Sequence, residues 1–278
     1  MPASAFLLAF AAAWIHGVSN VFVGRRQEPE AAFAFMLIVG VIAFAPIAVV
    51  TWDVDAAAIP YIAASAALEL GYFAFLAAGY RMSEVSLVYP VARGAAPILV
   101  LAGAVLFLQH DTTAGQIAGV VAVGTGILLV RGVGAMAHRA DANGFLLALA
   151  AGTFIAGYTL VDKQGLHHAA PIPYIELVLI GPAVLYSIVI WRLRGPVAFR
   201  REATWGIGLV GVVLFGTYIL VLFALRLAPA ASVSAVRETS VVIASGLAAV
   251  MAHERVTKTR FAGAVLVAAG IALVALTS

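Results

Sequence analysis

The sequence has few charges and no cysteine, and each shortage excludes a class of protein. Charged residues make up only 10% of its 278 residues, whereas soluble domains carry about 25%. The lack of cysteine excludes disulfides, thiol chemistry and cysteine-based metal sites. We also find no phosphate-binding glycine loop, no HExxH helix and no nucleophile elbow. We therefore predict no metal, no cofactor and no enzymatic activity, and we do not expect an ATP-driven pump.

Apolar residues dominate instead. They account for 64% of the sequence, and the mean hydropathy is +1.07. The alternation typical of membrane strands is absent, so the spans should be helices. The apolar runs predict an all-α membrane protein with ten transmembrane helices, at residues 4–23, 31–52, 57–80, 84–108, 114–130, 144–161, 174–191, 204–225, 231–251 and 259–276. The net charge of +3 is small, and the basic residues lie in short loops. Both observations argue against a nucleic-acid partner.

The two halves of the sequence resemble each other. One spacing of 144 residues separates three pairs, Arg93 and Arg237, Gly119 and Gly263, and Gly126 and Gly270. Each half holds five predicted helices, and an odd number places the second copy in the opposite orientation. We therefore predict two inverted five-helix repeats, residues 1–135 and 140–278, with a binding site near the midplane between them. The glycines of the fifth helix also predict a small-residue packing face.

Basic residues gather on one side of the predicted helices. The loops after the odd-numbered helices carry Arg25, Arg26, Arg81, Arg131, Arg139, Arg192, Arg194, Arg200, Arg201, Arg255, Lys258 and Arg260, and the other loops carry only Lys163 and Arg226. Positively charged loops stay in the cytoplasm. We predict a multi-pass protein of the plasma (inner) membrane with both termini in the periplasm.

Arg93 lies near the middle of the fourth apolar run, between Pro90 and Pro97. An arginine at the centre of a spanning helix costs about 2.5–3.5 kcal/mol on insertion scales. Such a residue faces a bundle interior or a wet cavity and has a partner. It is either half of a structural ion pair or a ligand for the carboxylate or phosphate of a substrate.

Three further charged side chains lie well inside apolar runs, Glu69, Arg237 and Glu238. The simplest arrangement pairs Glu69 with Arg93 or Arg237. Structure alone could explain such a pair, since removing one partner typically costs about 3–5 kcal/mol. On the functional interpretation, Glu69 binds an ammonium group or takes up a proton, which suits a proton-coupled carrier.

Polar and aromatic residues in the spans complete the candidate site. His16 and Asn20 share a helix face, either as a proton relay or as partners in interhelical hydrogen bonds, and Trp14 lies close to that face. Tyr72, Tyr89 and Tyr158 lie within spans, where they either line a cavity or pack against neighbouring helices. The predicted substrate-binding residues are thus Arg93, Glu69, Arg237, Glu238, His16, Asn20, Trp14, Tyr72, Tyr89 and Tyr158.

Three motifs resemble those of one family of transporters. They are His16-Gly-Val-Ser-Asn20, Tyr89-Pro-Val-Ala-Arg-Gly94 and Ala156-Gly-Tyr-Thr-Leu-Val-Asp-Lys163. Nearly the whole sequence is similar to the EamA branch of the drug/metabolite transporter superfamily. The resemblance implies secondary transport of a small metabolite, with ion or exchange coupling. Glu238 stands where Gly94 does in the first copy, so the resemblance implies no symmetrical role for the two arginines.

The residues and the resemblance together predict a secondary active transporter that works by alternating access. Its leading substrate is an amino acid or similar zwitterion, because the spans contain charges of both signs. The expected direction is export. The alternative is a carrier of quaternary ammonium (choline-like) or other organic cations, held in an aromatic cage of Trp14, Tyr72, Tyr89 and Tyr158. The predicted partners are a small-molecule substrate, the lipid bilayer and a coupling proton or ion. A monomer and a homodimer both fit.

Overall fold

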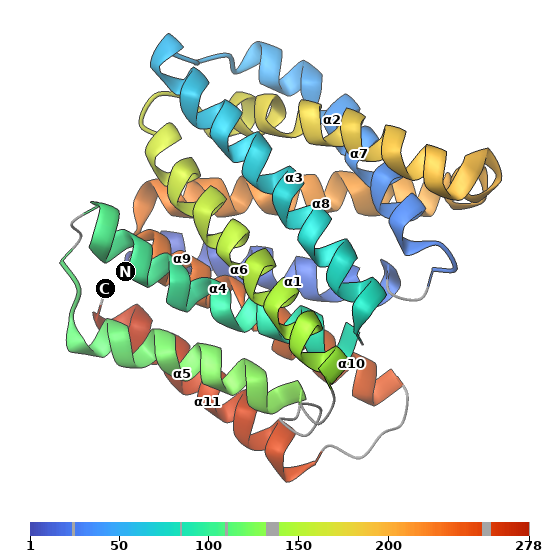
Figure 1. Ribbon diagram of the computed structural model, residues 1–278. Coiled ribbons are helices and arrows are strands. Elements are labelled where there is room, and N and C mark those ends of the chain that lie inside the picture. Colours follow the sequence, from blue (N-terminus) through green and yellow to red (C-terminus); the bar gives the residue numbers. More distant parts are fainter. Residues whose placement is uncertain (24–25, 84, 109–110, 132–138, 252–256, 278) are drawn as a thin grey trace.

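The computed structural model describes residues 1–23, 26–83, 85–108, 111–131, 139–251 and 257–277. Within these ranges the chain folds into long helices joined by short connections (Figure 1). In chain order they are α1 (Ala3–Val23), α2 (Pro29–Val50), the 3₁₀ helix η1 (Ala56–Ala58), α3 (Ile59–Met82), α4 (Val85–Leu108), α5 (Ala114–Arg131), α6 (Arg139–Gly165), α7 (Pro171–Glu202), α8 (Trp205–Leu227), α9 (Ala230–Arg237), α10 (Thr239–Met251) and α11 (Lys258–Thr277).

Seven of the described helices are long and apolar enough to cross a bilayer, namely α2, α3, α4, α6, α7, α8 and α11. Helices α1 and α5 contain apolar stretches that are shorter, at Ala3–Ser19 and Ala114–Val130. The prediction of an all-α membrane fold is thereby confirmed for the described residues. The prediction of ten spans is confirmed for seven helices.

The ninth predicted helix, at residues 231–251, is two helices, so this prediction is wrong. Helix α9 ends at Arg237 and α10 begins at Thr239. Glu238 between them has φ −70° and ψ −9°. The Thr239 hydroxyl donates to the carbonyl oxygen of Val236 at 2.6 Å, a bond that competes with the backbone bond of a continuous helix. Because neither proline nor glycine marks the break, hydropathy gives no sign of it.

Helix α7 is longer than the predicted span at 174–191. It begins at Pro171, a position where the missing N–H of proline costs nothing. It turns sharply at Gly195, whose φ of +80° glycine adopts without a steric cost. The segment after the turn carries Arg200 and Arg201, which were predicted to lie in a loop, and it ends at Glu202.

Helices α5 and α11 approach each other through glycines, and they run side by side in Figure 1. A Cβ atom on Gly119 would lie 2.8 Å from the carbonyl oxygen of Gly270, and one on Gly126 would lie 2.8 Å from that of Gly263. Small residues of this kind let helix backbones approach closely inside a membrane. The predicted small-residue face of the fifth helix is therefore confirmed.

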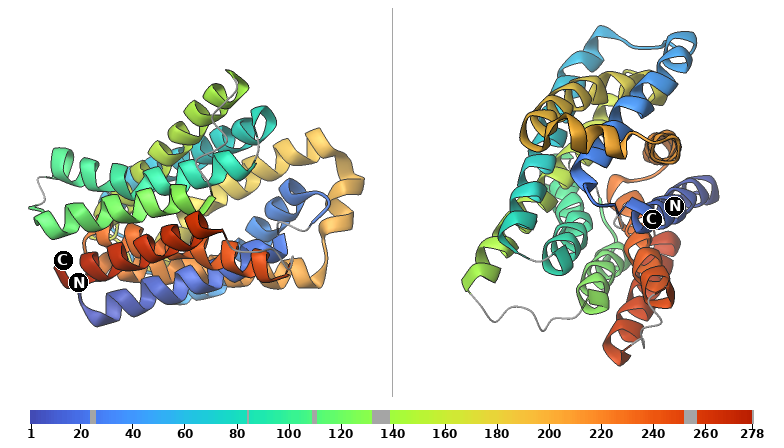
Figure 2. Two further views of the ribbon diagram at one scale, coloured as in Figure 1. Left: turned by 90° about the horizontal axis from the view of Figure 1, so that it is seen from below. Right: turned by 90° about the vertical axis from the view of Figure 1, so that its right-hand side faces the viewer.

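One end of the helix bundle, which we call the closed end, is joined by backbone pairing. The α2–α3 and α6–α7 connections form an antiparallel bridge between Val54 and Ala169, flanked by backbone hydrogen bonds of 2.9 and 2.7 Å. Beside the bridge, the rings of Tyr61 and His168 stack at 5.7 Å. Both chain termini lie together at this end (Figures 1 and 2).

The opposite end, which we call the open end, is joined by side chains instead. Ion pairs link the start of α2 and the residues before it to the last part of α7. They are Arg26 with Glu202 at 2.7 Å, Arg194 with Glu30 at 2.8 Å and Arg201 with Glu28 at 3.4 Å. Glu202 is buried, but the Arg194–Glu30 and Arg201–Glu28 pairs are exposed, and exposed pairs contribute about 0–1 kcal/mol each. The open end is therefore held more loosely than the closed end, where main-chain atoms pair.

Candidate functional site

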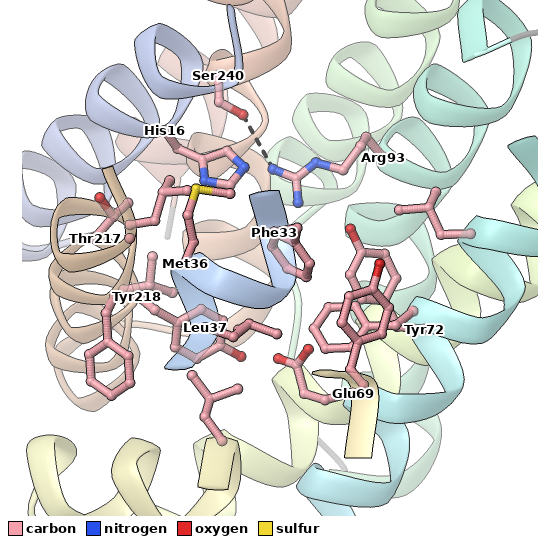
Figure 3. A pocket seen from close by; sticks show the side chains of 18 of the residues that line it. His16, Phe33, Met36, Leu37, Glu69, Tyr72, Arg93, Thr217, Tyr218 and Ser240 are labelled. Atoms are coloured by element: carbon pink, nitrogen blue, oxygen red, sulfur yellow. Dashed lines mark hydrogen bonds between the residues drawn. The ribbon is translucent and has the colours of Figure 1, made fainter. Parts of the chain in front are cut away.

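A cavity of about 340 Å³ extends from the middle of the bundle to the open end. Figure 3 shows side chains that line it. Helices α1–α4 and α6–α10 line it, from Glu69 and Arg237 at its inner part to Pro29 and Tyr80 near the open end. Its volume falls in the range of small-ligand pockets, about 300–1,000 Å³. Its walls are mainly apolar and aromatic, with few charged groups. This composition is typical of a site that binds a small organic molecule.

Arg93 is held on α4, which stays helical through Pro90 and Pro97. Its Nε lies 3.0 Å from Oε2 of Glu238, and its Nη2 donates to Oγ of Ser240 at 3.2 Å (Figure 3). Both partners lie at the break between α9 and α10. The predicted pairing of Arg93 with Glu69 is therefore wrong, because the break gives Arg93 a carboxylate partner from the other half of the chain.

Arg237 is the last residue of α9 and lines the cavity. Among the residues that the structure describes, it forms no ion pair with a carboxylate. Its guanidinium lies 5.6 Å from the centre of the Tyr218 ring, and Tyr158 lines the same cavity within electrostatic range of it. Such a guanidinium at a cavity wall can bind an anionic group of a ligand through its fork of N–H donors.

Glu69 lies on α3, is 4% exposed and lines the same cavity. It lies within electrostatic range of Tyr218, Arg237 and Asp162. The cavity therefore presents an acidic group and a basic group close to each other. A zwitterion requires this arrangement, because its ammonium and carboxylate groups are only a few atoms apart.

Asp162 is a buried residue that the sequence analysis did not select. It is 0% exposed and accepts three hydrogen bonds, from Ser65 at 2.5 Å, Tyr174 at 3.0 Å and Tyr218 at 2.9 Å. The predicted sixth span ran to 161, so Asp162 was placed at its end and outside the candidate site. The signal that could have found it is the pair Asp162-Lys163 at the end of an otherwise apolar run. The Lys163 ammonium group bonds to carbonyl oxygens at the end of α8, whereas Asp162 stays buried.

The residues predicted on α1 separate. His16 lines the cavity beside Arg93 and Ser240 (Figure 3). Trp14 does not, and its side chain is 53% exposed on the outer surface, so its predicted place in an aromatic cage is corrected. It points outward because it lies two residues from His16, about 200° around the helix. The side chain of Asn20 lies outside the part of the structure that is described.

The predicted tyrosines come together. Tyr72, Tyr89 and Tyr158 all line the cavity. Tyr158 contacts the rings of Tyr72 and Tyr218, each with ring centroids 6.2 Å apart. Sequence reasoning missed Tyr218, because no pattern in the sequence separates this tyrosine from the other aromatic residues of an apolar span. Glu238, by contrast, pairs with Arg93 and is not part of the cavity wall.

Apolar helices packed around a cavity with buried charges of both signs define a membrane transport protein for small molecules. The sequence matches the model of the EamA-like transporter family over residues 3–132 and 142–276. The chain belongs to this family, which is part of the drug/metabolite transporter superfamily, and is a multi-pass membrane protein.

Comparison with solved structures supports the fold. A structure described as "Crystal structure of protein" is 16% identical in sequence, with a TM-score of 0.78, and the match covers 99% of this chain and 98% of that one. At this identity the likeness concerns the fold alone. Comparison with curated proteins found no match.

Proposed function

We propose that the protein is a secondary active transporter of an amino acid or similar zwitterion. The observation that carries this proposal is the position of Arg237 and Glu69 on the wall of one cavity of about 340 Å³. Arg237 would bind the carboxylate and Glu69 the ammonium group. The aromatic rings of Tyr72, Tyr158 and Tyr218 would surround the body of the molecule.

Arg93 would serve this site indirectly. It is already paired with Glu238 and bonded to Ser240, so it has less capacity to bind a substrate than Arg237. Its role would be to hold the break between α9 and α10 in place. The break in turn positions Arg237 at the cavity wall, as half-helices do at the binding sites of other transporters.

The inverted repeat receives support from the packing of the helices. If α1–α5 correspond to α6, α7, α8, α9 with α10, and α11, then contacts should occur in reciprocal pairs. The contact of α3 with α6 matches that of α8 with α1, and the contact of α2 with α8 matches that of α7 with α3. Two contacts join equivalent helices directly, α2 with α7 and α5 with α11. The glycines follow the same rule, because Gly119 meets Gly270 and Gly126 meets Gly263. The repeats would be residues 1–135 and 140–278.

The difference between the two ends supports alternating access. The cavity reaches the open end, whereas the Val54–Ala169 bridge joins the closed end. With the basic loops in the cytoplasm, the open end faces the cytoplasm of the cell and both termini face the periplasm of the inner membrane. A cytoplasm-facing site of this kind is the loading state of an exporter.

A quaternary ammonium carrier is the second candidate, and the contacts among Tyr72, Tyr158 and Tyr218 favour it. Aromatic faces attract cations. Two arginines, Arg93 and Arg237, repel the same cation, and Trp14 points away from the cavity. The zwitterion accounts for the charges of both signs, so it is the leading proposal.

Ligand screening of the purified protein tests both candidates. We expect L-leucine and L-phenylalanine to raise the melting temperature and choline to leave it unchanged. The same amino acids should enter proteoliposomes saturably and compete with each other. Stabilisation by choline alone would favour the second candidate, and uptake that never saturates would contradict both.

Two variants connect uptake to the cavity. Ala77 lines the cavity toward the open end, so Ala77→Trp should fill it and abolish uptake of L-phenylalanine. Trp14→Phe changes an exposed residue outside the cavity and serves as the matched control, with uptake expected at the wild-type rate. Equal uptake by both variants would show that the substrate uses another route.

A further inference from the structure

A second cavity, of about 350 Å³, lies at the closed end of the bundle. The last residues of α6 and α8, the connection to α9 and one residue of α4 line it. It shares no lining residue with the central cavity. Figure 1 shows the ends of these helices on the side where both termini lie. Because the apolar spans of α6 and α8 end here, the cavity lies at the depth of the lipid headgroups.

Two basic side chains and one amide form the polar part of the wall of this second cavity. They are Lys163 and Gln164 near the end of α6 and Arg226 near the end of α8. Among the described residues no acidic side chain lines the cavity. Two cations without a carboxylate produce a positive potential there, and this potential favours an anionic ligand.

Basic residues are rare at the closed end, which makes their meeting in one cavity informative. Lys163 and Arg226 are the only lysine and arginine in the loops after the even-numbered predicted helices. They come from two different helices, and the fold brings both to the same cavity. A general surface charge would require no such convergence, whereas a binding site does.

The ammonium group of Lys163 is fixed in position by the end of α8. It donates to the carbonyl oxygens of Leu225 at 2.5 Å and Ala228 at 3.2 Å, and Ala228 lines the same cavity. A lysine ammonium group has three N–H donors. Two of them therefore hold Lys163 in place, and the third remains for a ligand.

Arg226 supplies a guanidinium group that is not committed elsewhere. Its side chain is exposed, and it forms no ion pair with any residue that the structure describes. Its five N–H donors form a planar fork that matches the oxygens of a phosphate group in pairs. Gln164 can add an amide donor from the neighbouring helix.

Exposed apolar side chains lead from the second cavity toward the hydrocarbon region of the membrane. Leu227 lines the cavity and is 49% exposed, and Phe223, one turn earlier on α8, is 37% exposed. Residues four apart in a helix lie on the same face, so these two side chains form an apolar strip that begins beside Arg226. An acyl chain can lie along this strip while its phosphate reaches the basic residues.

We infer that the second cavity binds a phosphate group between Arg226 and Lys163. The guanidinium holds two phosphate oxygens through its fork, and Lys163 adds one charge-assisted hydrogen bond. The apolar strip favours the phosphate of an anionic phospholipid, since basic pockets between membrane helices bind such headgroups. Free phosphate in solution is the other source of the same group. The inference does not depend on the proposed function, because none of these residues lines the central cavity.

Lipid titration of the purified full-length protein in detergent micelles tests the site. We expect phosphatidylglycerol to stay bound in native mass spectrometry and to raise the melting temperature. Phosphatidylcholine carries an additional positive charge and should bind much more weakly. Arg226→Gln should weaken the binding of phosphatidylglycerol at least tenfold, the loss expected when a charged hydrogen bond is removed. Arg226→Glu reverses the charge and should weaken it further.

Arg192→Gln is the matched control. Arg192 is an exposed arginine near the other end of the bundle, and it lines neither cavity. Its substitution removes the same charge, so it measures the general attraction between the protein and an anionic lipid. We expect it to bind phosphatidylglycerol as the wild type does. No weakening in Arg226→Gln, or equal weakening in both variants, would overturn the inference.

Inorganic phosphate separates the two sources of the phosphate group. If it stabilises the wild type but not Arg226→Gln, and phosphatidylglycerol stabilises neither, the site binds free phosphate. If neither probe shows binding that depends on Arg226, the inference is wrong. Lys163→Met tests the second cation, but it also removes two hydrogen bonds to the end of α8. Arg226→Gln breaks no ion pair among the described residues, so it decides the inference if Lys163→Met fails to fold.

Discussion

Arg93 and Arg237 stand 144 residues apart in the two halves of the chain, yet their surroundings differ. Arg93 lies within the unbroken helix α4 and is paired with a buried carboxylate, Glu238, at 3.0 Å. Arg237 ends the short helix α9 and lines the cavity, and among the described residues no carboxylate pairs with it. Two arginines at matching places in the sequence therefore lie in different surroundings, one in a buried ion pair and one at a cavity wall.

The difference arises from one residue. Position 94 in the first half is Gly94, and the matching position in the second half is Glu238. Gly94 lets the backbone of α4 pack closely on α5, where a Cβ would lie 3.2 Å from the carbonyl oxygen of Gly124. Glu238 instead supplies the carboxylate that neutralises Arg93. Because the second half provides the acid for the first, its own arginine has no carboxylate paired with it among the described residues, and it is available to a ligand.

Removing Arg93 should have the largest effect on stability. Arg93→Met leaves the carboxylate of Glu238 buried and unpaired, which costs about 3–5 kcal/mol. We expect a large fall in the melting temperature of the purified protein, measured by its tryptophan fluorescence. The double variant Arg93→Met/Glu238→Leu removes both charges and should recover most of that loss. If the double variant is as unstable as the single one, the ion pair is not what Arg93 contributes.

Removing Arg237 should affect binding more than stability. Among the described residues this guanidinium has no ion-pair partner, so Arg237→Met breaks no ion pair there. We expect the affinity for L-phenylalanine to fall at least tenfold, which corresponds to about 1.4 kcal/mol, with a smaller fall in melting temperature than in Arg93→Met. Calorimetric titration measures the first and thermal unfolding the second.

Arg237→Lys sharpens the same test. Lysine keeps the charge but loses the planar fork that binds a carboxylate through two bonds. Its affinity should lie between those of the wild type and Arg237→Met. The comparison between the arginines would fail if Arg237→Met bound the amino acid normally.

Much of this arrangement could be predicted from the sequence, because it depends on local composition. The apolar runs gave the helices α2, α3, α4, α8 and α11 to within a few residues. The rarity of charge in those runs also singled out Glu69, Arg93, Arg237 and Glu238, since charges at such depth are costly without a partner. The choice of partners could not be predicted. Which carboxylate meets Arg93 depends on the break after Arg237, and that break rests on side-chain bonds of Thr239 rather than on proline or glycine.

The same limit explains the residues that were misplaced. Asp162 follows the last apolar residue of its span, so its composition suggests a loop, and only the packing of α3, α7 and α8 around α6 surrounds it with hydroxyl groups. Trp14 is close to His16 in sequence, but the helical rotation between them turns it outward. Long-range contacts determine the surroundings of Asp162, and helix rotation determines the direction of Trp14. Hydropathy predicts neither.

Ser240 offers the smallest test of the comparison. Its hydroxyl accepts from Nη2 of Arg93 at 3.2 Å, and Ser240→Ala leaves the ion pair with Glu238 in place. We expect a loss of about 1 kcal/mol, typical of one hydrogen bond, measured by thermal unfolding. In the Arg93→Met background the same substitution should cost almost nothing, because its partner is already absent, and a double-mutant cycle measures this difference. An equal loss in both backgrounds would mean that Ser240 stabilises the break on its own, and that Arg93 is held by Glu238 alone.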